Sequence, residues 1–324
     1  MHNPVLTIAA KDAVDATRDR FVQTCTAVLA LAVVVSIVTG AIALRTDVAT
    51  YAAARDQLLA LGKPAAAIAA PAFYPLKLLR GAIEQIEIMG AVIALLAGYR
   101  AAAAERGRQT LALILTRPVR HWQFLAAKLA GGVALSALSL LAVFAVATIL
   151  LATVSGVGLT GDDILRLGLT WAAASIYVAS FYTLAFGLCL WARQPANGLL
   201  QGFVLWLVIV LVAPQIGDTL DPDNQVAGGV FAQLSVPKAE QDRIKAGYAG
   251  YEVLRNGIEI ASVTKHFERF SFAVLGIKDR YTGTLLAAVL AEKQGDALWI
   301  LLFALGLGGV VLLRPISPDR LTKE

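Results

Sequence analysis

The stretch ERGRQTLALILTRPVRHWQFLAAK, residues 105–128, separates two long apolar segments and decides how the fold is assigned. Leu111, Ile114 and Leu115 recur in it at helical spacing, which predicts a short amphipathic helix. Glu105 stands near the expected start of that helix, where a negative charge is favoured, and Pro118 would end it. We call residues 105–128 the basic insert.

Composition places the insert in a membrane protein. The chain has 324 residues, of which 58% are hydrophobic and 16% charged, whereas soluble domains average ~25% charged residues. The net charge of +5 fits Lys and Arg gathered on the cytoplasmic side of a membrane, and no basic patch interleaved with aromatic residues points to nucleic acid. Two cysteines inside apolar segments and three scattered histidines predict neither a disulfide framework nor a metal site.

Six membrane-spanning helices are expected in a single all-α domain covering residues 1–324. At ~1.5 Å per residue, segments of this length can cross a hydrocarbon core of ~30 Å. The first twenty residues are mixed and charged, so they do not resemble a signal peptide. The expected spans are residues 21–44, 81–104, 124–154, 167–192, 197–216 and 297–313.

The distribution of Lys and Arg predicts the orientation. Thirteen of these residues fall on the side that holds both termini and the basic insert, against six in the short loops opposite. Both termini are therefore expected in the cytoplasm, which leaves residues 45–80 and 217–296 as extracytoplasmic insertions. Helices are expected within them at residues 46–62 and 237–257, while residues 261–276 could lie on the membrane surface or pack against the spans.

Two interpretations of the basic insert stay open on the residues alone. It could be an interfacial loop held on anionic lipid, or a docking helix that offers apolar residues to a cytoplasmic partner with arginines at the rim. Residues 11–24, KDAVDATRDRFVQT, are similarly either an interfacial helix or the solvated start of the first span.

The order of Glu105, Thr110, Leu111, Pro118 and Lys128 resembles the signature of ABC-2 type transporter permeases. The opening LTIAAKDAVDATRDRF, residues 6–21, is similar to the N-terminal cytoplasmic helix of that family, and the six-span layout fits it. The resemblance leans toward the branch of the nitrous-oxide-reductase maturation permease. The chain departs from the family pattern in having Gln109 where Gly is usual, Asp12 in place of Glu, and a longer segment between the fifth and sixth spans.

The resemblance implies a permease subunit of an ATP-driven transporter, in particular an exporter, in a bacterial inner membrane. No GxxxxGK[ST] phosphate loop occurs in the sequence, so ATP and Mg would bind to a separate ABC ATPase subunit and this chain would not be an enzyme. Two copies would form a homodimer in the lipid bilayer. The basic insert would be the coupling helix that contacts the ATPase, through Glu105, Arg106, Arg108, Thr110, Leu111, Ile114, Leu115, Arg117 and Pro118.

Glu84 and Glu87 are candidates for the translocation path. They lie three residues apart on one face of the second span, and carboxylates at membrane depth are costly and often functional. The alternative is that both merely sit at the level of the lipid headgroups.

A second function stays open: a force-transmitting scaffold that remodels an extracytoplasmic partner held at residues 217–296, without moving a solute. A passive channel would need a continuous polar stripe, which the spans lack. The glycine pair Gly131–Gly132 in the third span predicts close helix packing.

Overall fold

The computed structural model describes residues 4–61, 74–107, 120–154, 158–219, 230–234, 236–247, 250, 253, 257 and 261–314. Over these residues the protein is helical and forms no β-strand. Within the described part of the chain, six helices are long and apolar enough to cross a membrane, as the sequence predicted. These candidate spans are Arg20–Gln57, Pro75–Arg106, Trp122–Val154, Gly161–Trp191, Pro195–Ile216 and Leu286–Leu313.

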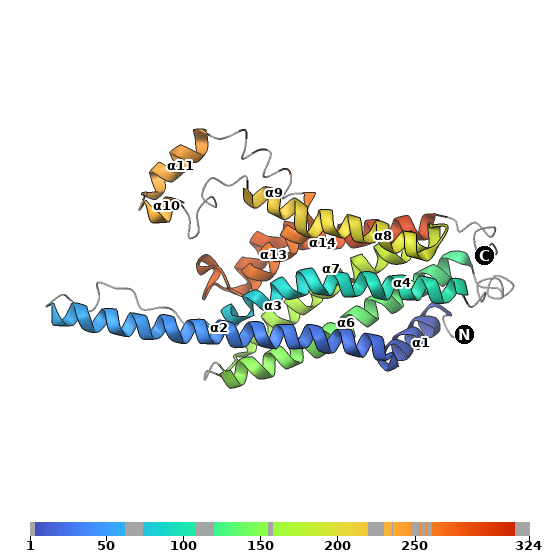
Figure 1. Cartoon of the computed structure of the whole chain (residues 1–324), viewed down its shortest axis with the longest axis horizontal. Helices are drawn as coiled ribbons and strands as arrows, with labels where there is room; N and C mark the ends of the chain where they lie inside the picture. The colour runs from blue at the N-terminus through green and yellow to red at the C-terminus, as the bar shows by residue number, and fades with distance from the viewer. Residues whose placement is uncertain are drawn as a thin grey trace.

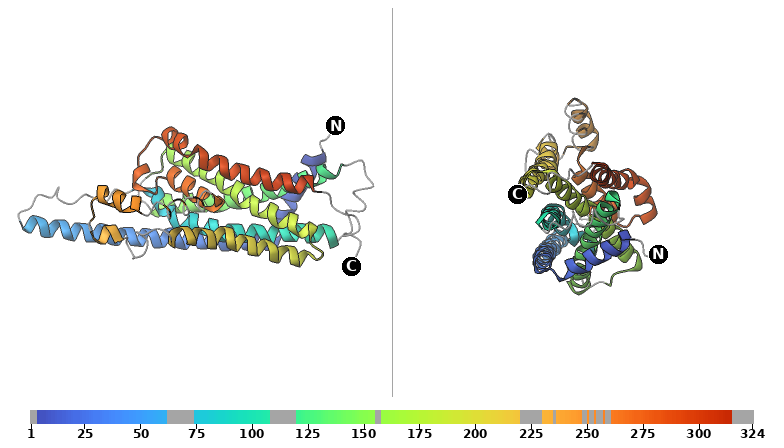
Figure 2. Two further views of the ribbon diagram at one scale, coloured as in Figure 1. Left: turned by 90° about the horizontal axis from the view of Figure 1, so that it is seen from above. Right: turned by 90° about the vertical axis from the view of Figure 1, so that its right-hand side faces the viewer.

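Helix α7 (Gly161–Trp191) is the centre of the bundle. Of its most apolar stretch 83% is buried, compared with 39% or less for the other spans. It packs against α4 (Ala91–Gly107), α6 (His121–Val154), α8 (Pro195–Trp206) and α14 (Leu286–Leu313), and the views in Figures 1 and 2 show these helices grouped side by side. A capping box between Thr160 and Asp163 starts α7, because each side chain bonds the backbone N–H of the other.

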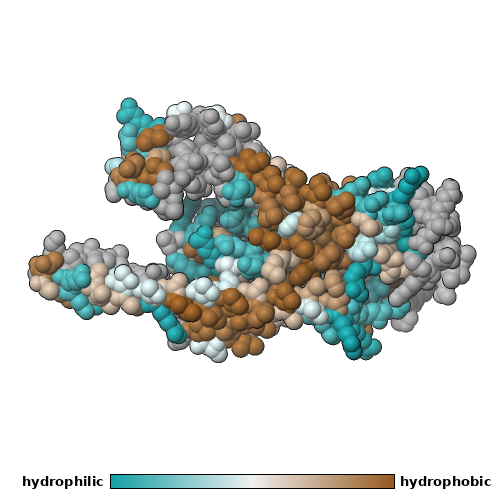
Figure 3. Space-filling model, viewed as in Figure 1, coloured by the Kyte–Doolittle hydropathy of each residue, from teal (hydrophilic) through white to brown (hydrophobic). Residues whose placement is uncertain are grey.

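The exposed surface of the bundle is apolar along its middle. Large hydrophobic side chains such as Leu31, Ile42 and Ile149 are more than half exposed there. Figure 3 shows this apolar zone across the middle of the molecule, with hydrophilic residues toward its ends. Such a distribution suits a protein whose middle is covered by lipid rather than by water.

The N-terminal segment forms a helix of its own. Helix α1 (Pro4–Arg18) ends before α2 (Arg20–Ala60) begins, and it packs against α6 at an angle to α2 (Figure 1). The Asp19 carboxylate between them accepts a hydrogen bond from the Phe21 N–H at 2.8 Å, which caps the start of α2. Residues 11–24 therefore belong to two helices and are not just the start of the first span.

Helix α2 corrects the expected first insertion. Residues 46–62 were expected as a separate helix, but residues 46–60 continue the first span without a break, so that α2 has 41 residues and a length of ~60 Å. Hydropathy falls at Arg45, yet no Gly or Pro occurs between Ala41 and Leu61 to end the helix. The C-terminal part of α2 projects beyond the bundle at the end opposite α1 (Figure 1).

Two spans contain a π-helical turn. In the second span, residues Ile86–Gly90 are π-helical between α3 (Arg80–Gln85) and α4, and a 3₁₀ turn at Pro75–Leu79 precedes α3. In the fifth span, residues Leu207–Val212 are π-helical between α8 and α9 (Ala213–Thr219). The helix of this span runs through Pro214 to Thr219, because the preceding π-turn accommodates a residue that lacks an N–H donor.

Carbonyl groups in both π-turns are paired with hydroxyls. The Tyr177 hydroxyl donates to the Glu87 carbonyl at 3.1 Å, and the Thr264 hydroxyl donates to the Ile209 carbonyl at 3.3 Å. These bonds satisfy buried backbone groups that would otherwise be costly inside a membrane.

Helix α13 (Val263–Val274) packs against the spans, which settles the choice left open by the sequence. The Ser262 hydroxyl caps its start by accepting from the Lys265 N–H, and Phe267 stacks on Tyr177 with ring centroids 4.6 Å apart. Two short helices, α10 (Val230–Gln233) and α11 (Lys238–Gly247), lie away from the bundle (Figure 1). Helix α11 begins directly after Pro237, where a helix was expected.

Helix α14 begins at Leu286, well before the expected span at residue 297. Its first turns carry Glu292 and Asp296, which the hydropathy profile assigned to the loop. Both carboxylates are paired: Tyr281 donates to Glu292 at 2.7 Å, and Asp296 lies 2.6 Å from the His266 imidazole. Pairing lets a charged segment continue as helix against α13.

Candidate functional site

The two ends of the basic insert meet in a charged cluster. The Lys128 ammonium on α6 lies 2.7 Å from the Glu105 carboxylate on α4 and 2.8 Å from the Asp12 carboxylate on α1. The side chains of Lys128 and Glu105 are only 11% and 12% exposed. Ion pairs that are partly withdrawn from water are screened less than surface pairs, so this cluster holds three helices in register.

Glu105 does not occupy the position expected for it. It lies in the last turns of α4, which runs on to Gly107, where the helix dipole disfavours a carboxylate. The Lys128 ammonium, which also pairs with Asp12, compensates for that position. The sequence placed Glu105 and Lys128 in one motif but gave no sign that they pair with each other and with α1.

Gly131 allows α1 to approach. A Cβ atom added at Gly131 would lie 3.1 Å from the Asp12 Cβ, tighter than ordinary van der Waals contact. At Gly132 an added Cβ would lie within the ring of Tyr182 on α7. The glycine pair therefore makes room for one helix on each side, in agreement with its expected packing role.

Arg106 attaches the end of α4 to the end of α7. Its guanidinium donates to the carbonyls of Cys189 at 3.0 Å, Ala192 at 2.7 Å and Arg193 at 2.6 Å. The last carbonyls of a helix have no intrahelical partner, and a cation near them is favourable. Arg106 thus caps α7 and connects the insert to the turn between the fourth and fifth spans.

A third connection joins α4 to the start of α2. Arg100 bonds Asp19 at 2.8 Å, and its guanidinium stacks over the Phe21 ring at 4.4 Å from the centroid. Motion of the α4 end would therefore be passed to α1, to α2 and to α7 together.

Seven of the expected coupling residues lie outside the described residues. The structure describes the insert at residues 105–107 and 120–128, which contain Glu105, Arg106 and Lys128. The contact role predicted for the others stays a prediction; they are Arg108, Thr110, Leu111, Ile114, Leu115, Arg117 and Pro118.

The two path candidates lie near the opposite end of the bundle. Glu84 pairs with Arg80 at 3.2 Å, and its side chain is 48% exposed. Glu87 lies in the π-turn, and its carbonyl accepts from Tyr177. Because the helix changes from α to π between them, their spacing of three residues no longer fixes a shared face.

The same end holds a buried polar contact that the sequence did not indicate. Tyr74 donates to the Asp163 carboxylate at 3.2 Å. Burial, together with this neighbouring carboxylate, raises the pKa of Tyr74 to about 12. Arg166 is 3% exposed and donates to the carbonyls of Val274, at 2.8 Å, and Thr284, which ties α7 to α13 and to the start of α14.

Comparison with known families decides the class. A family model described as ABC-2 family transporter protein matches residues 6–305. The chain belongs to the ABC-2 transporter family. No curated protein gives a significant match.

Membership makes the chain a multi-pass membrane permease subunit of an ABC transporter. The family is the membrane component and not the nucleotide-binding one, and it implies association with an ABC ATPase. In this chain the charged cluster lies at the base of the basic insert, the segment for which the sequence predicts contact with the ATPase.

Proposed function

We propose that the chain is one half of an ATP-driven exporter, driven by a separate ABC ATPase that docks on the basic insert. The observation that carries the proposal is the attachment of both ends of the insert to neighbouring helices. Lys128 and Glu105 fix it to α1, and Arg106 fixes it to the end of α7. A displacement of the insert would move these helices as a unit, because packed elements shift as rigid bodies.

The proposed orientation places α1, the insert and the turn after α7 in the cytoplasm of a bacterial cell, within its inner membrane. In support, the described residues at this end include Lys11, Arg18, Arg20, Arg120, Arg193 and Arg314, which is the enrichment expected for a cytoplasmic side. ATP and Mg would bind to the partner ATPase, and a second copy of this chain would complete the permease.

Co-purification tests the docking. Tagged permease is purified from membranes that also contain its ABC ATPase, as wild type and as the Leu111→Asp and Arg117→Glu variants. Wild type should retain the ATPase, and both variants should lose it, because each changes the apolar face or the basic rim of the insert. Leu59→Asp, at an exposed position on the projecting part of α2, is the matched control. Retention of the ATPase by both insert variants would contradict the proposal.

The proposed path runs along the first, second and fifth spans, with Glu84 and Glu87 at its outer end. Glu84 also has a local role, because it pairs with Arg80. Transport by the Glu84→Gln and Glu87→Gln double variant at the wild-type rate would remove both residues from the path.

The scaffold alternative is supported by the projecting segments. The C-terminal part of α2, together with α10 and α11, extends beyond the bundle at the end opposite α1 (Figure 1). The deletion that tests the scaffold alternative replaces only residues 220–260 with a short linker. Residues 261–296 are kept because they include α13 and the start of α14, which pack in the bundle. The scaffold predicts normal ATPase stimulation with loss of the cellular function; an exporter would keep transporting.

A further inference from the structure

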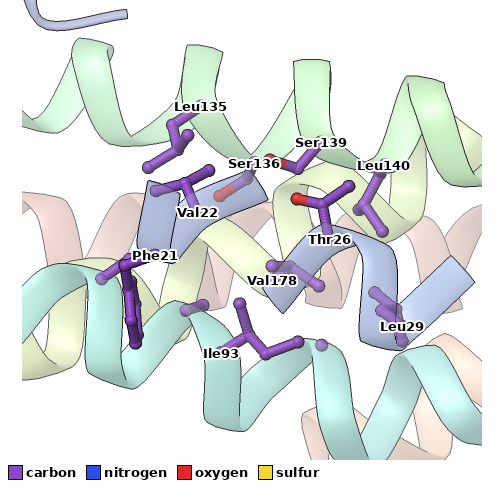
Figure 4. Close-up of a pocket in the computed structure, with 13 residues that line it drawn as sticks. Phe21, Val22, Thr26, Leu29, Ile93, Leu135, Ser136, Ser139, Leu140 and Val178 are labelled. Carbon is purple, nitrogen blue, oxygen red and sulfur yellow. The ribbon is translucent and has the colours of Figure 1, made fainter. Parts of the chain in front are cut away.

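Two adjoining pockets lie between α1, α2, α4 and α6, beside the charged cluster. The larger, of about 260 Å³, is lined by both charged and apolar side chains, and the smaller, of about 40 Å³, is apolar. Phe21, Val22, Ala97 and Leu135 line both, so one pocket continues into the other along the helices. In Figure 4, Val22 and Thr26 on α2 lie close to Leu135 and Ser136 on α6 around the apolar pocket.

The larger pocket has an excess of negative charge. Four carboxylates line it, those of Asp12, Asp15, Asp19 and Glu105, against the two cations Lys128 and Arg100. Arg100 is paired with Asp19, and Lys128 is shared by Asp12 and Glu105. Asp15 is exposed, and no partner for it lies among the described residues. The pocket is therefore short of positive charge.

Tyr182 points to a bound molecule independently of this charge. It lines the larger pocket although the residue is only 5% exposed, and its ring rests on Gly132. Its hydroxyl forms no hydrogen bond with any residue that the structure describes. The side chain is otherwise enclosed by the protein and its hydroxyl opens onto the pocket, so a polar group of a ligand bound there is placed to form a hydrogen bond with it.

We infer that the paired pockets bind an organic cation with an apolar tail. The cationic head, such as a primary ammonium with its three N–H donors, would lie among Asp15, Glu105 and the Tyr182 hydroxyl. The tail would follow Phe21 and Val22 into the apolar pocket, toward Leu29, Ile93 and Leu140. The negative charge of the larger pocket excludes a ligand with an anionic head. The adjoining apolar pocket fits a ligand with a hydrocarbon tail rather than a small inorganic cation.

The inference deepens the proposed function, because it rests on export to make this ligand a substrate. An ammonium in the pocket would compete with Lys128 for Asp12 and Glu105. Binding of the ligand would therefore loosen α1 from the base of the insert, because ligand binding and the attachment of α1 would use the same carboxylates.

Binding is tested with the full-length permease in nanodiscs of zwitterionic lipid, by calorimetry against empty nanodiscs. The probes are decylammonium, decyl sulfate, decanol and methylammonium. Saturable binding is expected for decylammonium alone. Decyl sulfate lacks the cationic head, decanol the charge and methylammonium the tail.

Two variants test the assigned site. Tyr182→Phe removes only the hydroxyl and keeps the ring on Gly132, and Asp15→Asn changes an exposed carboxylate, so neither should impair folding. Each should weaken decylammonium binding by about tenfold, as expected for loss of one charge-assisted hydrogen bond. Asp56→Asn, on the projecting part of α2, and Tyr177→Phe, whose hydroxyl bonds Glu87, are controls that should bind as wild type does.

Equal saturable binding of decyl sulfate, or unchanged affinity in Tyr182→Phe and Asp15→Asn, would overturn the inference. If Tyr182→Phe is unstable, the affinity of Asp15→Asn alone tests the inference, because Asp15 is exposed and its substitution should not impair folding. Failure here would leave the result of the ATPase co-purification untouched, whereas retention of the ATPase by both insert variants, with decylammonium binding intact, would overturn only the proposed function.

Discussion

Lys128 is the residue on which the proposed coupling depends. It neutralises two carboxylates from two other helices, so its removal leaves Asp12 and Glu105 facing each other with little solvent. We expect Lys128→Met to lower the unfolding free energy by about 1–3 kcal/mol, the cost of leaving a partly buried charge unpaired. It should also lower ATPase stimulation, because α1 is released from the insert.

A double-mutant cycle separates the ion pair from the packing of the lysine stem. Lys128→Met and Glu105→Gln are combined, and thermal unfolding is measured for all four proteins. The pair should contribute a coupling free energy of at least ~0.5 kcal/mol. Additive effects would mean that the 2.7 Å contact has no energetic role.

Tyr74 should be among the last tyrosines to ionise. Burial and the Asp163 carboxylate raise the pKa of Tyr74 to about 12, above the value of ~10 for an unfolded chain. The raised pKa means that its stabilising contribution is complete below pH ~10 and is lost as the pH rises through 12.

Phenolate absorbance measures this directly. The difference between the titrations of wild type and Tyr74→Phe should show one transition near pH 12. A transition near pH 10 would show that the Tyr74 hydroxyl is free of Asp163.

The sequence indicated several of the important individual residues, but not which residues they contact. Glu105 and Lys128 were assigned to one motif, yet Asp12 lies more than a hundred residues from Lys128 along the chain, and spacing carries no information about such a contact. Tyr182 looked like one of several hydroxyl residues in the fourth span. Its role follows from Gly132 and the pocket, which only packing reveals.

Arg166 joins three helices at the opposite end. It caps α13 through the Val274 carbonyl and holds the start of α14 through Thr284, from a position on α7 that is nearly closed to water. We expect Arg166→Met to lower the unfolding free energy by about 2–4 kcal/mol, because two carbonyls and Asp162 lose their partner. Arg55→Met on the exposed part of α2 should change it little, and similar loss in both variants would contradict the capping role.

Two helices extend beyond the apolar residues from which their bounds were predicted. The expected first span ended where apolar residues end, but α2 continues because Ala-rich sequence with no breaker remains helical. The start of α14 was missed because hydropathy falls over Glu292 and Asp296, although both carboxylates are paired, Glu292 with Arg280 and Tyr281 and Asp296 with His266 and Lys293. The number and the order of the spans can be predicted from composition, whereas the residues at which the helices begin and end depend on contacts with other parts of the chain.

Charged side chains connect the helices at both ends of the molecule, through Arg166 at one end and around the base of the insert at the other. Helices α1, α4, α6 and α7 meet around the base of the insert, and the end of α14 joins them through Arg314, which stacks over Trp191 at 4.5 Å. The other end carries the projecting segments. Such a division suits a machine that receives force at one side of a membrane and acts at the other.

Site-specific cross-linking during ATP turnover tests whether the ABC ATPase contacts the basic insert. A photoreactive phenylalanine analogue replaces Thr110 in the basic insert or, as control, Leu59 on the projecting part of α2, and the permease is assembled with its ABC ATPase in proteoliposomes. The account predicts a cross-link to the ATPase from position 110 and none from position 59. A chain in which position 110 never cross-links to the ATPase while ATP is hydrolysed would contradict it.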